Sequence, residues 1–281
     1  MYLSNYHSHS LFCDGRSTPE DFVKFALSAG FKAYGFSSHS PLPFETNWNM
    51  SASDLTAYLE HTAYLKEKYK GRIELYTSLE IDYLDETYNP SISYFREMPL
   101  DYRIGSVHLI PVARKLVETN MVSIDGPFEA FAKAVEIHFG GDVKRLVRRY
   151  YGSSMRMVEA GDIDIVGHMD KIYMNGQQCA GFSLDSDWYT ALVKDYIHLI
   201  AEKNLMVEIN TKNLIRRQHT YPHRMFFSLL KELDIPVMVN SDCHFPHLVN
   251  DGRKEAFELL HAYGFKSTRE LIGGKWTDVP L

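Results

Sequence analysis

The chain has 281 residues, of which 45% are hydrophobic and 23% are charged, an ordinary composition for a globular protein. This length is enough for a sizeable core in one large α/β domain or two smaller ones. The net charge of -6 does not suggest a nucleic-acid scaffold, and no apolar run is long enough to cross a bilayer. No signal peptide is visible at the start, and the scattered Cys13, Cys179 and Cys243 indicate reduced thiols in a cytoplasmic protein.

Short apolar runs alternate with longer segments of helical period along the chain. The first predicted helix has Ser17 or Thr18 as its cap, Pro19 in its first turn and Gly30 at its end. The predicted strands are Tyr2–His7, Ala33–Ser37, Ile73–Leu79, Tyr102–Val107, Ile163–Gly167, Leu205–Ile209 and Pro236–Asn240. The predicted helices are Pro19–Ser28, Ser53–Tyr69, Phe128–Ile137, Val143–Ala160, Asp187–Lys203, Pro222–Leu233 and Arg253–Ala262.

The order of these elements predicts a parallel sheet. Most of the seven strands are followed by a helix, and strands such as LMVEINT and PVMVNSD are apolar up to their polar ends. Seven strands come close to the eight of a TIM barrel. We therefore expect a single domain over residues 1–281, with a distorted (β/α)7 barrel as first choice and an open doubly wound sheet as second.

Histidines and carboxylates stand where the predicted strands end. In a β/α barrel, the chemistry lies at the carboxyl ends of the strands. His7 and His9 are two residues apart, a spacing that places both side chains on one face of a strand. Later strands end in further residues of the same kind: His39, Glu80, His108, His168, Asp242 and His244.

This combination of residue types predicts a metal centre. Imidazole and carboxylate together suit zinc, iron(II) and manganese. Eight protein ligands are too many for one zinc ion, so two or three divalent ions are expected. Glu80 is central in the series, and its carboxylate can bridge two ions. Such a pair of ions would lower the pKa of a water molecule that they share and would stabilise the attacking and leaving oxygens of a displacement at phosphorus.

The ordered motifs HSHSLFCDG, GFSSHSPLP, SLEIDY, GSVHLI, VGHMD, EINT and NSDCH resemble those of the polymerase-and-histidinol-phosphatase (PHP) superfamily. The resemblance runs nearly end to end and is strongest to the histidinol phosphatases of histidine biosynthesis. It implies a distorted seven-stranded barrel with a trinuclear metal site.

The resemblance also implies a distribution of the ligands among the ions. His7 and His9 would hold the first ion with Glu80 and Asp242. Glu80 would bridge to a second ion, held also by His108 and His168, and the third ion would be held by His39 and His244. Where relatives often have a further histidine this chain reads CDG, so Asp14 is expected to serve as a ligand of the third ion.

A basic loop after the sixth strand is the predicted phosphate site. Arginine binds phosphate with a planar, bidentate fork. The loop reads KNLIRRQHTY, and the resemblance implies that Arg216 or Arg217 contacts phosphate, a choice that the sequence leaves open. Lys171, Tyr173 and Lys212 are further candidates, and Asp14 is a candidate partner for a cationic amine of the substrate.

The function that the resemblance implies is hydrolysis of L-histidinol phosphate to L-histidinol and phosphate by a metal-bridged hydroxide. Glu80 would support the hydroxide, and Asp242 or His244 would protonate the leaving alkoxide. The alternatives are a related phosphoesterase that acts on a nucleotide or sugar phosphate, and a non-catalytic metal-binding module. We expect a small-molecule substrate and no nucleic-acid or membrane partner.

Overall fold

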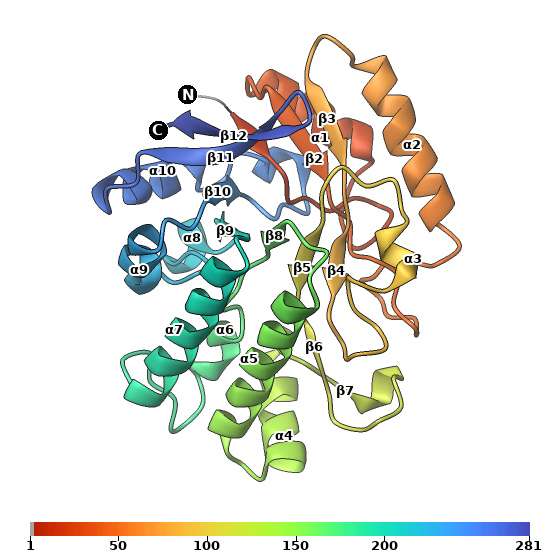
Figure 1. The fold of residues 1–281 in the computed structure, drawn as a ribbon. Coiled ribbons are helices and arrows are strands. Elements are labelled where there is room, and N and C mark those ends of the chain that lie inside the picture. Colours follow the sequence, from red (N-terminus) through yellow and green to blue (C-terminus); the bar gives the residue numbers. More distant parts are fainter. Residues whose placement is uncertain (1–2) are drawn as a thin grey trace.

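The computed structural model describes residues 3–281, so the first residue of the predicted strand Tyr2–His7 lies outside the described part. Strands and helices alternate along most of this length (Figure 1). The strands that pair in parallel are β1 (Ser4–Asn5), β2 (Ala33–Phe36), β3 (Glu74–Thr77), β4 (Glu80–Asp82), β5 (Ile104–Ser106), β8 (Ile165–Val166), β9 (Met206–Asn210) and β10 (Val237–Asn240).

The helices follow the predicted pattern closely. The longer ones are α1 (Pro19–Ser28), α2 (Leu55–Lys68), α4 (Phe128–Phe139), α5 (Val143–Ala160), α7 (Asp187–Glu202), α9 (Phe227–Glu232) and α10 (Arg253–Ala262). Short turns of helix are α3 (Ser93–Arg96), α6 (Tyr173–Gly176), α8 (Leu214–Arg217), η1 (Glu118–Asn120), η2 (Arg224–Phe226) and η3 (Pro246–Leu248). At the start of α1, Thr18 and Asp21 form a capping box ahead of Pro19, which explains why the predicted boundary is correct.

The parallel strands form two sheets, in the orders β1-β2-β3 and β10-β9-β8-β5-β4. Isolated bridges link these sheets, one between Ser8 and Cys243 and one between His39 and Glu80. The predicted parallel α/β architecture is confirmed, but the strand pairing is not the continuous ladder of a closed barrel. The third predicted strand is divided, because Ser78 still donates its backbone N–H to Phe36 whereas Leu79 accepts from Ile104 of β5.

A cluster of apolar side chains lies between the two sheets. Except for β4, it draws on every parallel strand or its immediate flank, through Tyr6, Ala33, Tyr76, Tyr102, Ile104, Ile165, Met206, Met238 and, from a later segment, Leu271. That segment is an antiparallel hairpin of β11 (Ser267–Ile272) and β12 (Lys275–Pro280), which was not predicted. Trp276 of the hairpin packs edge-on against Tyr6 and Tyr102, at centroid distances of 5.6 and 5.9 Å.

The hairpin therefore covers the amino ends of the strands. Ala33 and Met206 are the first residues of β2 and β9, and both belong to the cluster that Leu271 completes. In Figure 1 the hairpin lies across one end of the molecule, while α4, α6 and a second hairpin lie toward the other end. That second hairpin, β6 (Leu109–Pro111) with β7 (Met121–Ser123), follows β5 directly and extends beyond its carboxyl end.

The helices cover the outside of the strands. α5 and α7 lie side by side (Figure 1), and Tyr151 of α5 shares a hydroxyl–hydroxyl hydrogen bond of 3.2 Å with Tyr189 of α7. Their buried faces belong to an apolar cluster that also includes Val166, Val207 and Val239 of the strands. Within residues 3–281 no helix combines the length and the apolar character needed to span a bilayer.

Candidate metal centre

The predicted donor residues converge at the carboxyl ends of the strands. His7 and His9 follow β1, and Glu80 opens β4. His39 follows β2, and His108 follows β5 after one intervening residue. Of the other donors, His168 follows β8, Asp242 and His244 follow β10, and Asp14 lies in the loop after β1. Residues far apart in the sequence thus meet in one place, as the strand-end argument predicted.

Glu80 lies at the centre of this group and is fully buried. Its Oε2 lies 3.0 Å from Nδ1 of His39 and 3.2 Å from Nε2 of His7. Its Oε1 lies 2.7 Å from Nε2 of His168 and 3.5 Å from Nε2 of His108. Burial alone would raise the pKa of the Glu80 carboxyl, but the neighbouring imidazoles of His7, His108 and His39 hold that pKa well below its usual range.

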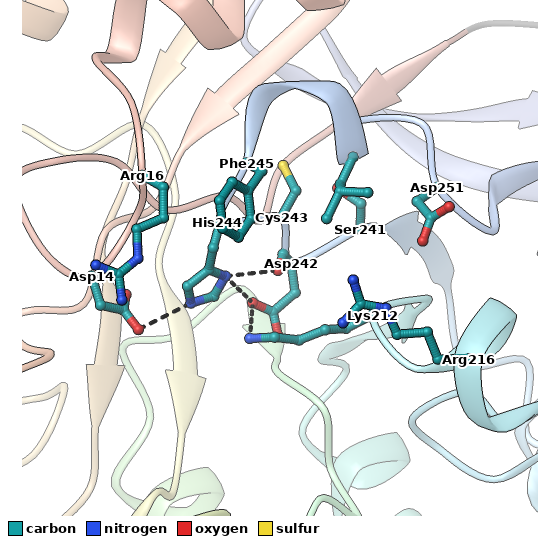
Figure 2. Close-up of a pocket in the computed structure, with 11 residues that line it drawn as sticks. Asp14, Arg16, Lys212, Arg216, Ser241, Asp242, Cys243, His244, Phe245 and Asp251 are labelled. Atoms are coloured by element: carbon teal, nitrogen blue, oxygen red, sulfur yellow. Dashed lines mark hydrogen bonds and ion pairs between the residues drawn. The ribbon is translucent and has the colours of Figure 1, made fainter.

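Asp242 and Asp14 extend the group toward the surface. Asp242 Oδ1 lies 3.1 Å from Nε2 of His9 and 3.0 Å from Nζ of Lys212. Asp14 Oδ2 lies 3.1 Å from Nε2 of His244, and its Oδ1 lies 3.8 Å from ring nitrogens of both His9 and His39. Figure 2 shows this row, in which His244 stands between the two carboxylates. Both carboxylate oxygens of Asp14 thus lie within 3.8 Å of imidazole nitrogens of this group.

The donor atoms fit divalent metal ions. Among residues 3–281, six buried atoms of these donor residues have no hydrogen-bond partner: His7 Nε2, His9 Nε2, His39 Nδ1, His168 Nδ1, Glu80 Oε2 and Asp14 Oδ1. A buried polar atom left unpaired costs about 1–3 kcal/mol, so a cluster of such atoms indicates a cation-binding site. Four overlapping donor sets occur in the described structure: His9 Asp14 His39 His244, His7 His168 Asp242, His7 His9 Glu80, and His39 Glu80 His108.

Two supporting carboxylates were not predicted. Asp82 Oδ1 lies 3.1 Å from Nδ1 of His108 and accepts a hydrogen bond of 2.7 Å from the backbone N–H of that residue. Glu208 of β9 lies against Nδ1 of His7, at 2.8 Å. Signals for both were present in the sequence, because Asp82 follows Glu80 at the same-face spacing of two, and Glu208 interrupts an apolar strand.

Two lysines border the donor group. Lys171 is buried, and its Nζ lies 3.1 Å from Asp125 Oδ2 and 3.4 Å from Nε2 of His108. Burial would raise the pKa of Asp125, but the Lys171 ammonium holds it well below its ordinary value, so the two form a charged pair. The Nζ of Lys212 lies 3.0 Å from Asp242 Oδ1. Both ammonium groups are therefore placed to meet an anion at the donor group.

A pocket of about 310 Å³ opens beside Asp14, Asp242 and His244. Arg16, Lys212 and Arg216 line it together with Phe245 and the carboxylate of Asp251, and Figure 2 shows Arg216 extending toward the pocket from α8. Arg16 was not predicted as a site residue, because a single arginine after CDG matches no recognised phosphate-binding motif.

The other predicted substrate residues lie differently. Arg216 and Arg217 are both exposed, but Arg217 is not among the described residues that line this pocket. Tyr173 packs against the rings of His219 and His223, at centroid distances of 5.5 and 5.6 Å. Of the two arginines left open by the sequence, Arg216 thus has the geometry of a pocket residue.

A parallel α/β fold that gathers histidines and carboxylates at its strand ends defines a metal-binding protein with an adjoining, cation-lined pocket. The model of the PHP domain family matches residues 5–212, and the chain belongs to this family. The resemblance found in the sequence motifs is thereby confirmed.

The chain is similar to named members of this family. It is 27% identical over 253 residues to a Deinococcus radiodurans protein named "Probable histidinol-phosphatase", with 87% of each chain covered. It is 24% identical over 269 residues to the histidinol-phosphatase of Bacillus subtilis, covering 87% of this chain and 94% of that protein. A structure of histidinol phosphate phosphatase from Lactococcus lactis, in complex with zinc, L-histidinol and phosphate, matches with a TM-score of 0.73 at 19% identity and 98% coverage of both chains.

Proposed function

We propose that the protein is a histidinol-phosphatase, which hydrolyses L-histidinol phosphate to L-histidinol and phosphate in L-histidine biosynthesis. The observation that carries the proposal is the buried group of histidines and carboxylates that opens on a pocket lined by cations. The names of the curated relatives, which are matched over most of their length, support the choice of substrate.

The four overlapping donor sets support two or three divalent ions, with zinc, iron(II) or manganese as the candidates. The first pair of ions would share Glu80, and His9, Asp14, His39 and His244 would hold the third. When bound, such ions supply Lewis acidity toward the phosphate and lower the pKa of a water molecule.

The chain's own residues would bind the phosphate and manage the protons. Lys171 and Lys212 place ammonium groups beside His108 and Asp242 of the donor group, and Arg216 adds a planar guanidinium at the pocket. Water would attack phosphorus as the ester P–O bond breaks, and a proton that the attacking water gives up would reach the leaving alkoxide through His244 or Asp242. His244 is the better placed of the two, because it borders the pocket and its side chain is 16% exposed against 2% for Asp242.

Fold and location form part of the same proposal. The interior cluster, which draws on seven of the eight parallel strands or their flanks, supports a distorted and interrupted (β/α)7 barrel. Asp242 and His244 lie beyond the segment that matches the family model, and β10 pairs with β9; both observations support one domain over residues 1–281. The free thiols of Cys13, Cys179 and Cys243 fit a reducing, cytoplasmic environment.

The test is phosphate release from a panel of esters by the metal-loaded protein. L-Histidinol phosphate should be hydrolysed with a higher kcat/KM than nucleotide or sugar phosphates, and a chelator should abolish the activity. A higher kcat/KM for a nucleotide or sugar phosphate would assign the site to another phosphoesterase. A metal-loaded protein that hydrolyses none of the esters would indicate a metal-binding module.

A further inference from the structure

Glu208 is buried beneath the metal centre with no exposed surface, and hydrogen-bond donors surround its carboxylate. Its Oε2 lies 2.8 Å from Nδ1 of His7 and accepts from the side-chain amide of Asn240 at 3.1 Å. Its Oε1 accepts from the backbone N–H of His168 at 2.7 Å and from the side-chain amide of Asn210 at 2.9 Å. Each carboxylate oxygen therefore has two partners.

This arrangement requires a group that only accepts hydrogen bonds. The two asparagine amides and the backbone N–H of His168 are donors, so the carboxylate imposes the same role on Nδ1 of His7. A glutamine at position 208 would turn an NH₂ group toward at least one of these donors. The identity of residue 208 is thus restricted by hydrogen bonding as well as by volume.

The contact with His7 determines which ring nitrogen carries the proton. With Nδ1 donating to Glu208, Nε2 keeps its lone pair, and Nε2 is the atom that faces Glu80 at 3.2 Å and Asp242 at 3.9 Å. A carboxylate behind a ligand histidine in this way fixes the tautomer and the orientation of the ring.

The same carboxylate contacts the other residues of one donor set. His7, His168 and Asp242 form a set whose ligand atoms lie within 4.8 Å of one another. Glu208 holds the ring of His7 and the backbone of His168, and it reaches Asp242 through Asn210, whose amide also donates to Asp242 Oδ2 at 3.1 Å. Three loops that follow different strands are thereby tied to one side chain.

We propose that Glu208 is a positioning residue that sets the tautomer of His7 and holds His7, His168 and Asp242 together as one metal-binding set. This inference rests on the metal centre of the proposed function and not on its substrate. Glu208 would act through the residues that it orients, without contact with the substrate.

The test compares Glu208→Gln with a matched control, Glu270→Gln. Glu270 is also a buried carboxylate, but it lies on β11 at the opposite end of the strands and accepts from the hydroxyls of Ser4, Tyr6 and Thr268. Zinc affinity is measured by competition with a chromogenic chelator, without substrate. Glu208→Gln should bind zinc at least about tenfold more weakly than the parent, whereas Glu270→Gln should match the parent.

A second measurement reports on the tautomer. Imidazole ¹H–¹⁵N correlation spectra of the parent should show His7 protonated at Nδ1, and Glu208→Gln should lose or shift that signal. If Glu208→Gln does not fold, Glu208→Asp replaces it. Aspartate keeps the charge but withdraws the carboxylate from His7 by one methylene, and it should weaken zinc binding in the same direction.

Parent-like zinc affinity in the Glu208 variant, an unchanged His7 signal, or an equal loss of affinity in Glu270→Gln would each overturn the inference. Since these readouts need no substrate, failure of the protein to hydrolyse L-histidinol phosphate would contradict the proposed function alone.

Discussion

Glu80→Gln replaces one oxygen of the central carboxylate by an amide NH₂ and removes its negative charge. The fold should tolerate the change, because glutamine has nearly the same shape and volume. Metal binding should be weakened, because Glu80 belongs to two donor sets, one with His7 and His9 and one with His39 and His108. A single substitution therefore weakens two sets at once.

The expected size of the effect follows from these contacts. A hydrogen bond or ligand contact that involves a charged group contributes about 1.5–3 kcal/mol, so the loss of one such contact in each set costs about 3–6 kcal/mol. At 1.36 kcal/mol for each factor of ten, kcat/KM should fall by roughly 10²- to 10⁴-fold.

The assay measures phosphate release from L-histidinol phosphate alongside the metal content of the same sample. The control is Glu86→Gln, a carboxylate in the loop after β4 that is 77% exposed and lies 3.6 Å from the Arg156 guanidinium, and it should behave like the parent. Glu80→Gln with full metal content and a kcat/KM close to that of the parent would refute the central role of this carboxylate.

Three further outcomes are expected. Asp14→Ala should lose one ion first during graded chelation, and an unchanged order of metal loss would contradict its role as a ligand. Arg216→Ala should lower kcat/KM by about tenfold or more, whereas Arg217→Ala, which changes a residue outside the pocket lining, should leave kcat/KM unchanged; equal effects would remove the distinction. Burial raises the pKa of the Glu270 carboxyl, so its contribution to stability is present below its ordinary pKa and is lost as pH rises through the raised value. Urea denaturation of the metal-free protein should therefore show a steeper fall in unfolding free energy from about pH 4 to pH 7 for the parent than for Glu270→Gln, and parallel curves would contradict this.

Local signals predicted the helices and most strands. α5 starts and ends at its predicted residues because Asp142 caps its first turn and Gly161 follows its last. The β11–β12 hairpin was missed, although Gly273 and Gly274, both with positive φ, form the two-residue turn that such a hairpin favours. Its stability depends on Trp276 packing against residues far away in the sequence, which no local pattern reveals.

The donor residues of the site were predictable for a similar reason. Position at a strand end is a local property, and parallel strands bring their ends together without further information. The partners of these donors were not predictable in the same way. Asp125 reaches Lys171 from the loop after β7, and Glu208 reaches His7 across the sheets, so both contacts follow from the folded arrangement of distant strands.

The donor set of His9, Asp14, His39 and His244 joins the beginning of the chain to a loop near its end. An unfolded chain cannot keep these residues together, so the free energy of ion binding adds to the free energy of folding. At a free ion concentration 100 times the Kd, one such site adds about 2.7 kcal/mol to the stability of the folded state. The melting temperature would then follow the metal supply, and in a metal-poor cell the protein would become a substrate for proteases as well as an idle enzyme.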